Sequence, residues 1–231
     1  NLRLFVNGDP AKPQPIHPSV IADLEVDKKN IEEKLAQKRQ AQQKMVNAGM
    51  AANPVEGYRL LLDAQDDFPH LSGLDQRLAR GWQQALDYLL SRIREKIITA
   101  TWEKDHFNFP AAKQALGEAQ GLIASWPGKD QPEELKNQSQ SGTALVAEIT
   151  ADEYKFKEFN LRYERVKELE AGGEINTALE QFEALLEDEE YSSDARYMQY
   201  ARQDLRALNK KLNASKSAAD KLELARKAEQ E

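Results

Sequence analysis

The sequence of 231 residues contains no cysteine, which excludes a disulfide scaffold and thiol chemistry. It has only 11 glycines and 9 prolines, so few positions interrupt a helix. No apolar run approaches the ~20 residues that a membrane-spanning helix needs. Alternating runs of Val, Ile and Thr are rare, which gives β-structure little support. Together, these absences favour a fold built from helices.

The chain also lacks the residue patterns that carry common enzyme chemistry. Each of its histidines, His17, His70 and His106, falls in or beside a predicted linker or turn, without a second ligand at metal-binding spacing. There is no Gly-rich phosphate loop with a lysine and no Gly-x-Ser-x-Gly elbow. We therefore predict no catalytic residue, no metal site and no cofactor, and we expect neither an enzyme nor a small-molecule substrate.

The net charge of −7 disfavours nucleic-acid binding, which needs Lys and Arg to neutralise phosphates, and also binding to anionic membrane surfaces. The charge is uneven, because residues 148–190 hold 14 acidic and 5 basic side chains. One interpretation is an ordinary solvated set of helix faces. The other is an acidic patch that meets a basic partner or another copy of the chain.

Helical patterns of two lengths are present in the sequence. Long segments begin near four residues that follow one another at intervals of 53 to 62 positions, and near-fixed spacing of similar units is typical of repeat architectures. The long segments start near Ser19, Ser72, Gln131 and Ser193, and the short ones between them are Pro54–Phe68, Phe109–Trp126 and Ile175–Glu189.

Several local signals predict where the helices begin and end. Ser19 is a candidate N-cap for the first long helix, and Gly49 suits a left-handed residue at its end. Asn53 followed by Pro54 predicts the start of the first short helix. Gly173 predicts the end of the third long helix. The boundaries therefore rest on caps and breakers as well as on periodicity.

The ends of the chain differ from its middle. Residues 1–18 are rich in proline and predict a linker or arm, in which Leu2–Val6 is either a strand-like run or the tail of a preceding domain. Residues 19–213 form the expected helical domain, and 214–231 a mobile or partner-dependent helical tail. Because the chain starts at Asn1 and its last helix has no stop signal, we expect a piece of a longer or processed protein. Its compartment stays open, with the cytoplasm favoured.

The short segments share a pattern of a small residue followed four positions later by a large apolar one. Ala178 and Phe182 show it after Gly173, and two further copies follow the same rule. In this respect the short helices resemble the first helix of a tetratricopeptide (TPR) repeat, over about a fifth of the chain. The 34-residue period of that family is not present. The resemblance implies a scaffold of helical hairpins whose usual role is protein binding. The two further pairs are Ala112 with Leu116 and Gly57 with Leu61.

We predict an all-α fold, an elongated antiparallel stack of about seven helices that alternate between long and short. The predicted function is a non-catalytic scaffold module of a larger protein that binds a protein segment in a helical groove. Two alternatives are a self-associating structural rod and a regulatory segment attached to an enzyme. The tryptophans should pack in the core, whereas an exposed one would mark a binding hot spot. The candidate partner-binding residues are Tyr191, Arg196, Tyr197 and Tyr200.

Overall fold

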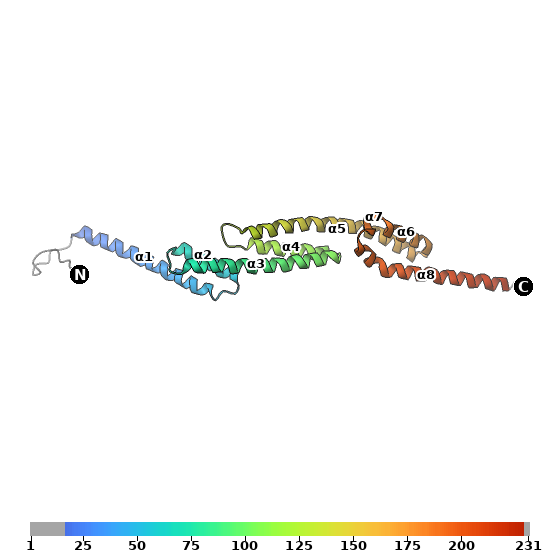
Figure 1. Cartoon of the computed structure of the whole chain (residues 1–231), viewed down its shortest axis with the longest axis horizontal. Coiled ribbons are helices and arrows are strands. Elements are labelled where there is room, and N and C mark those ends of the chain that lie inside the picture. Colours follow the sequence, from blue (N-terminus) through green and yellow to red (C-terminus); the bar gives the residue numbers. More distant parts are fainter. Residues whose placement is uncertain (1–16, 229–231) are drawn as a thin grey trace, which may run out of the picture. The chain divides into compact units, whose positions relative to one another are not determined.

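The computed structural model describes residues 17–228, and this part of the chain contains eight helices and no strand (Figure 1). The predicted all-α fold class is therefore confirmed. In chain order the helices are α1 (Pro18–Ala48), α2 (Pro54–Asp67), α3 (Leu74–Asp105), α4 (Phe109–Ala124), α5 (Glu133–Ala171), α6 (Ile175–Glu187), α7 (Glu189–Ser192) and α8 (Ala195–Ala228).

One helix more is present than the seven expected. Helix α7, of 4 residues, lies between the short segment that the sequence predicted as far as Glu189 and the long one predicted from near Ser193. The side chain of Asp188 caps it by accepting from the N–H of Glu190. The acidic run before Tyr191 thus supplies a helix cap. The stacking of all helices into one elongated body and the TPR resemblance stay predictions.

The caps agree with the sequence at two positions and differ at two. The side chain of Asn53 accepts from the N–H of Glu56 at 3.0 Å, and Gly173 adopts the left-handed φ of 84°. At the start of α1, however, the cap is His17, whose ring nitrogen accepts from the N–H of Ser19. Gly49 keeps a right-handed φ of −73°, because its N–H bonds back to Val46 and Asn47 in a tight final turn.

Parts of both predicted terminal segments lie outside the described residues. This applies to residues 1–16 of the linker, including Leu2–Val6, and to residues 229–231 of the tail. The rest of the tail continues α8 as far as Ala228, and its described side chains beyond Leu212 are exposed. The mobility of this tail stays a prediction.

The helices contribute to two compact units. Unit 1 comprises the described residues up to Ile93 together with Leu122–Lys136, and its core joins α1, α2 and the start of α3. Trp126 adds a second contact region, since its ring lies 5.4 Å from Tyr58 and 6.1 Å from Trp82. The buried core residues of the helix contact are Ala41, Leu61, Ala64, Leu71 and Leu74.

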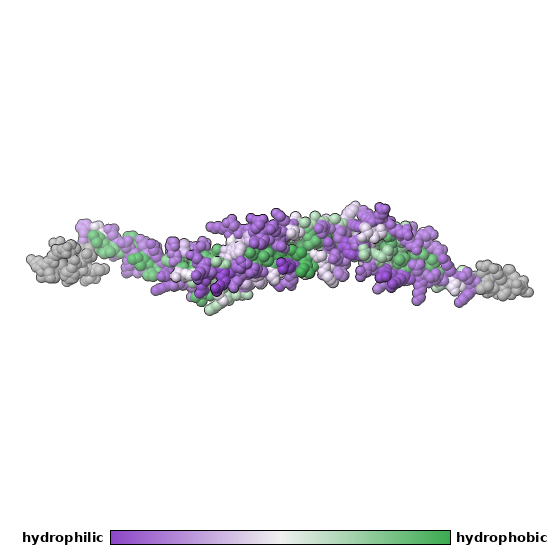
Figure 2. Space-filling model, in the orientation of Figure 1, coloured by the Kyte–Doolittle hydropathy of each residue, from purple (hydrophilic) through white to green (hydrophobic). Residues whose placement is uncertain are grey.

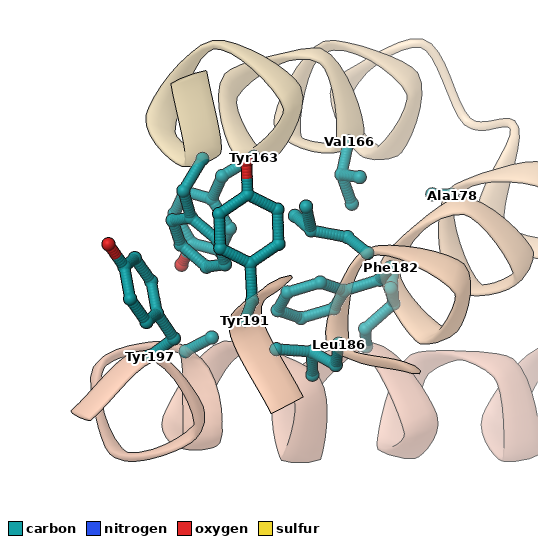
Figure 3. Close-up of a cluster of buried hydrophobic side chains, with 11 residues drawn as sticks. Tyr163, Val166, Ala178, Phe182, Leu186, Tyr191 and Tyr197 are labelled. Atoms are coloured by element: carbon teal, nitrogen blue, oxygen red, sulfur yellow. The ribbon is translucent and has the colours of Figure 1, made fainter. Parts of the chain in front are cut away.

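Unit 2 comprises Arg94–Gly121 and the described residues from Asn137 onward. Its larger cluster is aromatic and is formed by side chains from α5, α6, α7 and α8, as Figure 3 shows. A second cluster joins the end of α3, α4 and α5 around Leu116 and Ile149. The larger cluster consists of Phe159, Tyr163, Val166, Ala178, Phe182, Leu185, Leu186, Tyr191, Tyr197, Ala201 and Leu208.

Phe107, between α3 and α4, contacts both clusters of unit 2. It has a left-handed φ of 59°, a conformation that bulky side chains rarely adopt and that costs about 1–3 kcal/mol. Its ring stacks on Phe156 at 4.4 Å and lies 5.2 Å from Tyr197. The unusual backbone is thus offset by the aromatic contacts that it makes possible.

The three small–large pairs of the short helices are buried. Ala178 and Phe182 lie in the aromatic cluster of unit 2, and Ala112 and Leu116 in its second cluster. In unit 1, Gly57 and Leu61 are buried on the inner side of α2. The pattern therefore marks the face by which each short helix packs on its neighbours.

Candidate partner-binding groove

A groove in unit 1 opens between the end of α1, α2 and the first part of α3, with a volume of about 400 Å³. Its lining is mainly apolar and includes three glycines, and its polar side chains come mostly from α3. The lining residues are Met45, Ala48, Gly49, Pro54, Gly57, Tyr58, Leu61, Arg77, Arg80, Gly81 and Gln84.

Two glycines allow the helices around the groove to approach closely. A Cβ atom at Gly57 would lie 2.9 Å from the backbone oxygen of Ala48, and one at Gly81 would lie 2.8 Å from Cδ1 of Leu61. Neither distance is compatible with an ordinary contact. Because the first obstacle is backbone, only glycine allows α2 to lie this close to α1.

We expect Gly57→Ala to destabilise unit 1 by about 1–3 kcal/mol, since the added methyl group must push α2 away from α1. The matched control is Gly117→Ala in α4, where a Cβ would have no neighbour within 4 Å. That substitution should stabilise the protein by about 0.4–1 kcal/mol. Urea denaturation followed by circular dichroism measures both, and destabilisation of equal size in the two variants would contradict the close approach.

The walls of the groove are held by specific contacts. Lys44 of α1 pairs with Asp67 of α2 at 2.8 Å, and this hydrogen bond raises the pKa of the lysine. Burial of Tyr58 in unit 1 raises the pKa of its hydroxyl group above the ordinary value. The ion pair thus joins α1 to α2, the two helices that line the groove together with α3.

Arg77 and Arg80 bring positive charge to the groove. Their spacing of three residues places them on the same side of α3. Nη1 of Arg77 donates to the backbone oxygen of Met45 at 3.2 Å, which satisfies one carbonyl acceptor near the end of α1. Among the described residues, no carboxylate lies within ion-pair distance of either arginine. Most of their N–H groups thus remain available for an acceptor brought by a ligand.

The groove is suited to binding. Its lining contains no histidine, cysteine, serine or carboxylate that would serve as a nucleophile or general base. Within the described residues, no group of three or more His, Cys, Asp or Glu side chains is arranged to hold a metal ion. In the same part of the chain, no helix is both long and apolar enough to cross a membrane.

The four residues predicted to bind a partner lie in unit 2, and two of them are core residues. Tyr191 and Tyr197 belong to the aromatic cluster, and Tyr197 is only 1% exposed (Figure 3). Tyr200 is 48% exposed, with its ring edge against Phe156 at 5.4 Å. Of the three tyrosines, Tyr200 alone presents a large face to solvent. Partner binding by this set stays a prediction.

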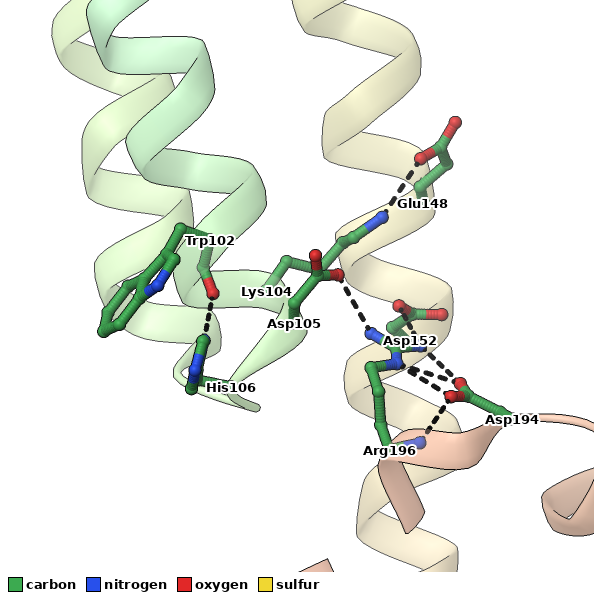
Figure 4. Close-up of polar contacts among 8 residues, drawn as sticks. All are labelled: Trp102, Lys104, Asp105, His106, Glu148, Asp152, Asp194 and Arg196. Atoms are coloured by element: carbon green, nitrogen blue, oxygen red, sulfur yellow. Dashed lines mark hydrogen bonds and ion pairs between the residues drawn. The ribbon is translucent and has the colours of Figure 1, made fainter. Parts of the chain in front are cut away.

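Arg196, the fourth predicted residue, connects three helical segments (Figure 4). Its Nη2 lies 2.6 Å from Asp194 at the start of α8 and 3.0 Å from Asp152 of α5. Nη1 lies 3.6 Å from Asp105 at the end of α3, and the guanidinium covers the ring of Phe107 at 5.4 Å. The guanidinium group of this arginine is therefore engaged by contacts within the chain.

Trp102 departs from the expectation that the tryptophans are core residues. Trp126 is buried, but Trp102 is 56% exposed, because it lies off the apolar face of α3 that enters the core. His106 stacks on it at 4.0 Å, and a ring nitrogen of His106 lies 2.7 Å from the backbone oxygen of Trp102 (Figure 4). Ile98, one turn earlier, is also exposed. These residues form a second candidate surface for a partner.

Two glycines in the sequence are local signals for the groove. Gly57 is the small residue of a small–large pair in a short helix, and Gly81 lies inside the pattern of a long helix. Isolated glycines within helices usually have a packing reason. The role of Arg77 and Arg80 depends on which helix lies opposite them, and periodicity does not contain that information.

Comparison with known proteins identifies no matching family model, no matching curated protein and no matching solved structure.

Proposed function

We propose that this chain is a non-catalytic scaffold module that binds a segment of a partner protein in the groove between α1, α2 and α3. The observation that carries the proposal is an apolar groove with two arginines that have no carboxylate partner among the described residues. Apolar clefts with a few convergent polar groups are the usual form of a recognition site.

The lining also indicates the chemistry of the partner segment. Met45, Ala48 and Leu61 offer apolar contact, and Tyr58 adds an aromatic wall. Arg77 and Arg80 favour carboxylates, which guanidinium groups bind with charge-assisted hydrogen bonds. The proposed ligand is therefore a peptide segment with apolar side chains next to one or two acidic groups. An extended polyanion is disfavoured by the net charge of −7.

Selection from a random peptide display library tests this directly, with the whole chain as the target. We expect the enriched peptides to combine apolar and acidic residues. The double variant Arg77→Glu, Arg80→Glu should weaken their binding by at least tenfold in fluorescence anisotropy, because each lost charged hydrogen bond contributes about 1.5–3 kcal/mol. Binding of the wild-type chain should also weaken with added salt.

The matched control makes the same charge change on α8. Arg202 and Arg206 are exposed and make no ion pair with the described residues, and neither lines the groove. The double variant Arg202→Glu, Arg206→Glu should therefore leave the affinity within about twofold. Equal losses in the two double variants would contradict a specific groove. The affinity of Tyr200→Ala is measured in the same series. If the affinity for the peptides falls in this variant and not in the Arg77 variant, the binding site lies at the residues predicted from the sequence.

A further inference from the structure

The first 23 residues of α1 have no cover within the described chain. Every side chain from Pro18 to Gln40 is exposed, and α1 first contributes to a core at Ala41. Most helical stability in proteins comes from the packing of an apolar face, and this part of α1 has no such packing within the described chain. Two exposed pairs on the helix, Lys28–Glu32 and Lys29–Glu33, contribute only a few tenths of a kcal/mol each.

This uncovered part carries an apolar stripe. Val20, Leu24, Ile31 and Leu35 follow one another at intervals of four, seven and four residues, which places them on one side of the helix. All four are more than 40% exposed, and Ile21 extends the stripe at its edge. Figure 2 shows hydrophobic side chains of this segment on the surface. A stripe of this width suits one partner helix, as in a two-stranded coiled coil.

Acidic and basic side chains are separated along the same segment, with the acidic ones near its start and the basic ones near its end. Residues 20–27 contain Asp23, Glu25 and Asp27 and no basic residue. Residues 34–39 contain Lys34, Lys38 and Arg39 and no acidic residue. Between these ends, the positive and negative charges of the pairs Lys28–Glu32 and Lys29–Glu33 cancel. A second copy in parallel register would place like charges together, whereas an antiparallel copy would place each acidic end against a basic end.

We propose that the uncovered part of α1 pairs antiparallel with the same segment of a second copy of the chain. The two apolar stripes then meet, with Leu24 of one copy near Leu35 of the other. Because the contact is the same on both copies, it closes as a two-fold dimer and does not extend into a filament. The pairing uses the exposed half of α1 and leaves its groove-lining end, at Met45 and Ala48, in place.

Sedimentation equilibrium tests whether the dimer exists. The full chain should dimerise in the range of roughly 1–100 μM, a modest affinity for a short stripe. Ile31→Gln with Leu35→Gln should shift the chain to monomer and lower the helical signal in circular dichroism. The control Val26→Gln changes a side chain that is 59% exposed on the other side of the same helix, and it should leave the dimer unchanged. A wild-type chain that stays monomeric, or a stripe variant that still dimerises, would overturn the proposal.

Two further measurements test the orientation. Added salt should weaken an antiparallel dimer and strengthen a parallel one, because salt screens attraction in the first and repulsion in the second. The chain has no cysteine, so single spin labels at Ala22→Cys or Asn30→Cys report unambiguous distances between copies. In the antiparallel arrangement, residue 30 lies near the two-fold axis and residue 22 far from it. The distance between the labels on the two copies should therefore be clearly longer at residue 22 than at residue 30. Equal distances at the two positions would refute it.

Discussion

Phe159→Ala is expected to destabilise unit 2 by about 3–5 kcal/mol, the usual effect of removing a large ring from a closed core. Phe159 of α5 is completely buried, and its ring lies 4.7 Å from Tyr197 and 5.2 Å from Tyr191. Truncation therefore leaves a cavity among three helices whose tyrosines cannot all move to fill it. Urea denaturation gives the free energy, and hydrogen exchange by mass spectrometry assigns the loss to peptides of unit 2.

A control for this prediction lies two residues further along the same helix. Leu161 is 74% exposed, so Leu161→Ala should change the free energy of unfolding by no more than about 0.5 kcal/mol. If the two substitutions had the same effect, Phe159 would not be part of a closed core. Faster exchange in unit 1 peptides of the Phe159 variant would instead show that the two units unfold together.

Arg196→Met should cost about 2–4 kcal/mol of stability, because it leaves Asp105, Asp152 and Asp194 near one another without their shared cation. Breaking a buried ion pair costs about 3–5 kcal/mol, and the arginine is one quarter exposed, which lowers this value. Arg196→Lys should give an intermediate loss, since an ammonium group cannot reproduce the several directed bonds of a guanidinium group. Urea denaturation at pH 7 compares the three proteins.

The matched control is Arg165→Met. Arg165 pairs with Glu168 at 2.8 Å, but both side chains are about two-thirds exposed. The loss should therefore be no more than about 1 kcal/mol. A similar loss for the two methionine variants would contradict the role of Arg196 as the connection between α3, α5 and α8.

The Arg196 cluster also predicts a dependence on pH. The hydrogen bonds from Arg196 hold the pKa of Asp194 below its ordinary value of 3.8. A carboxyl group whose pKa is lowered by folding stabilises the protein above its unfolded pKa, and this contribution is lost as pH falls through the folded value. The stability difference between wild type and Arg196→Met should thus be largest above pH 5 and should narrow steadily below pH 4. A constant difference down to pH 3 would show that Asp194 does not contribute through this pair.

The sequence was sufficient for the helices because their signals are local. Asn53 and Gly173 mark boundaries through their own backbone preferences, and the small–large pairs identify the packing faces of α2, α4 and α6. The sequence favours Ser19 as the cap of α1 because serine is a common cap and histidine is not, yet the cap is His17. Local rules therefore place the helices well and miss unusual solutions at their ends.

Local signals do not determine the candidate site, since it depends on which helices are neighbours. Tyr197 and Tyr200 are three residues apart on α8, yet one is buried and the other half exposed. A tyrosine is suited to a core or to a surface, so its type alone does not separate these cases. Arg77 and Arg80 became a candidate site only through the ends of α1 and α2 that lie opposite them.

The position of Phe107 has a consequence for how unit 2 melts. One ring belongs to two clusters, so α3 and α4 on one side share a structural element with α5 and α8 on the other. Loss of either cluster removes the contacts that offset the left-handed backbone of this residue, and the other cluster then loses a neighbour as well. Shared residues of this kind couple local unfolding events. Heating should accordingly disrupt both clusters in a single cooperative transition, with Phe107 as the link between them.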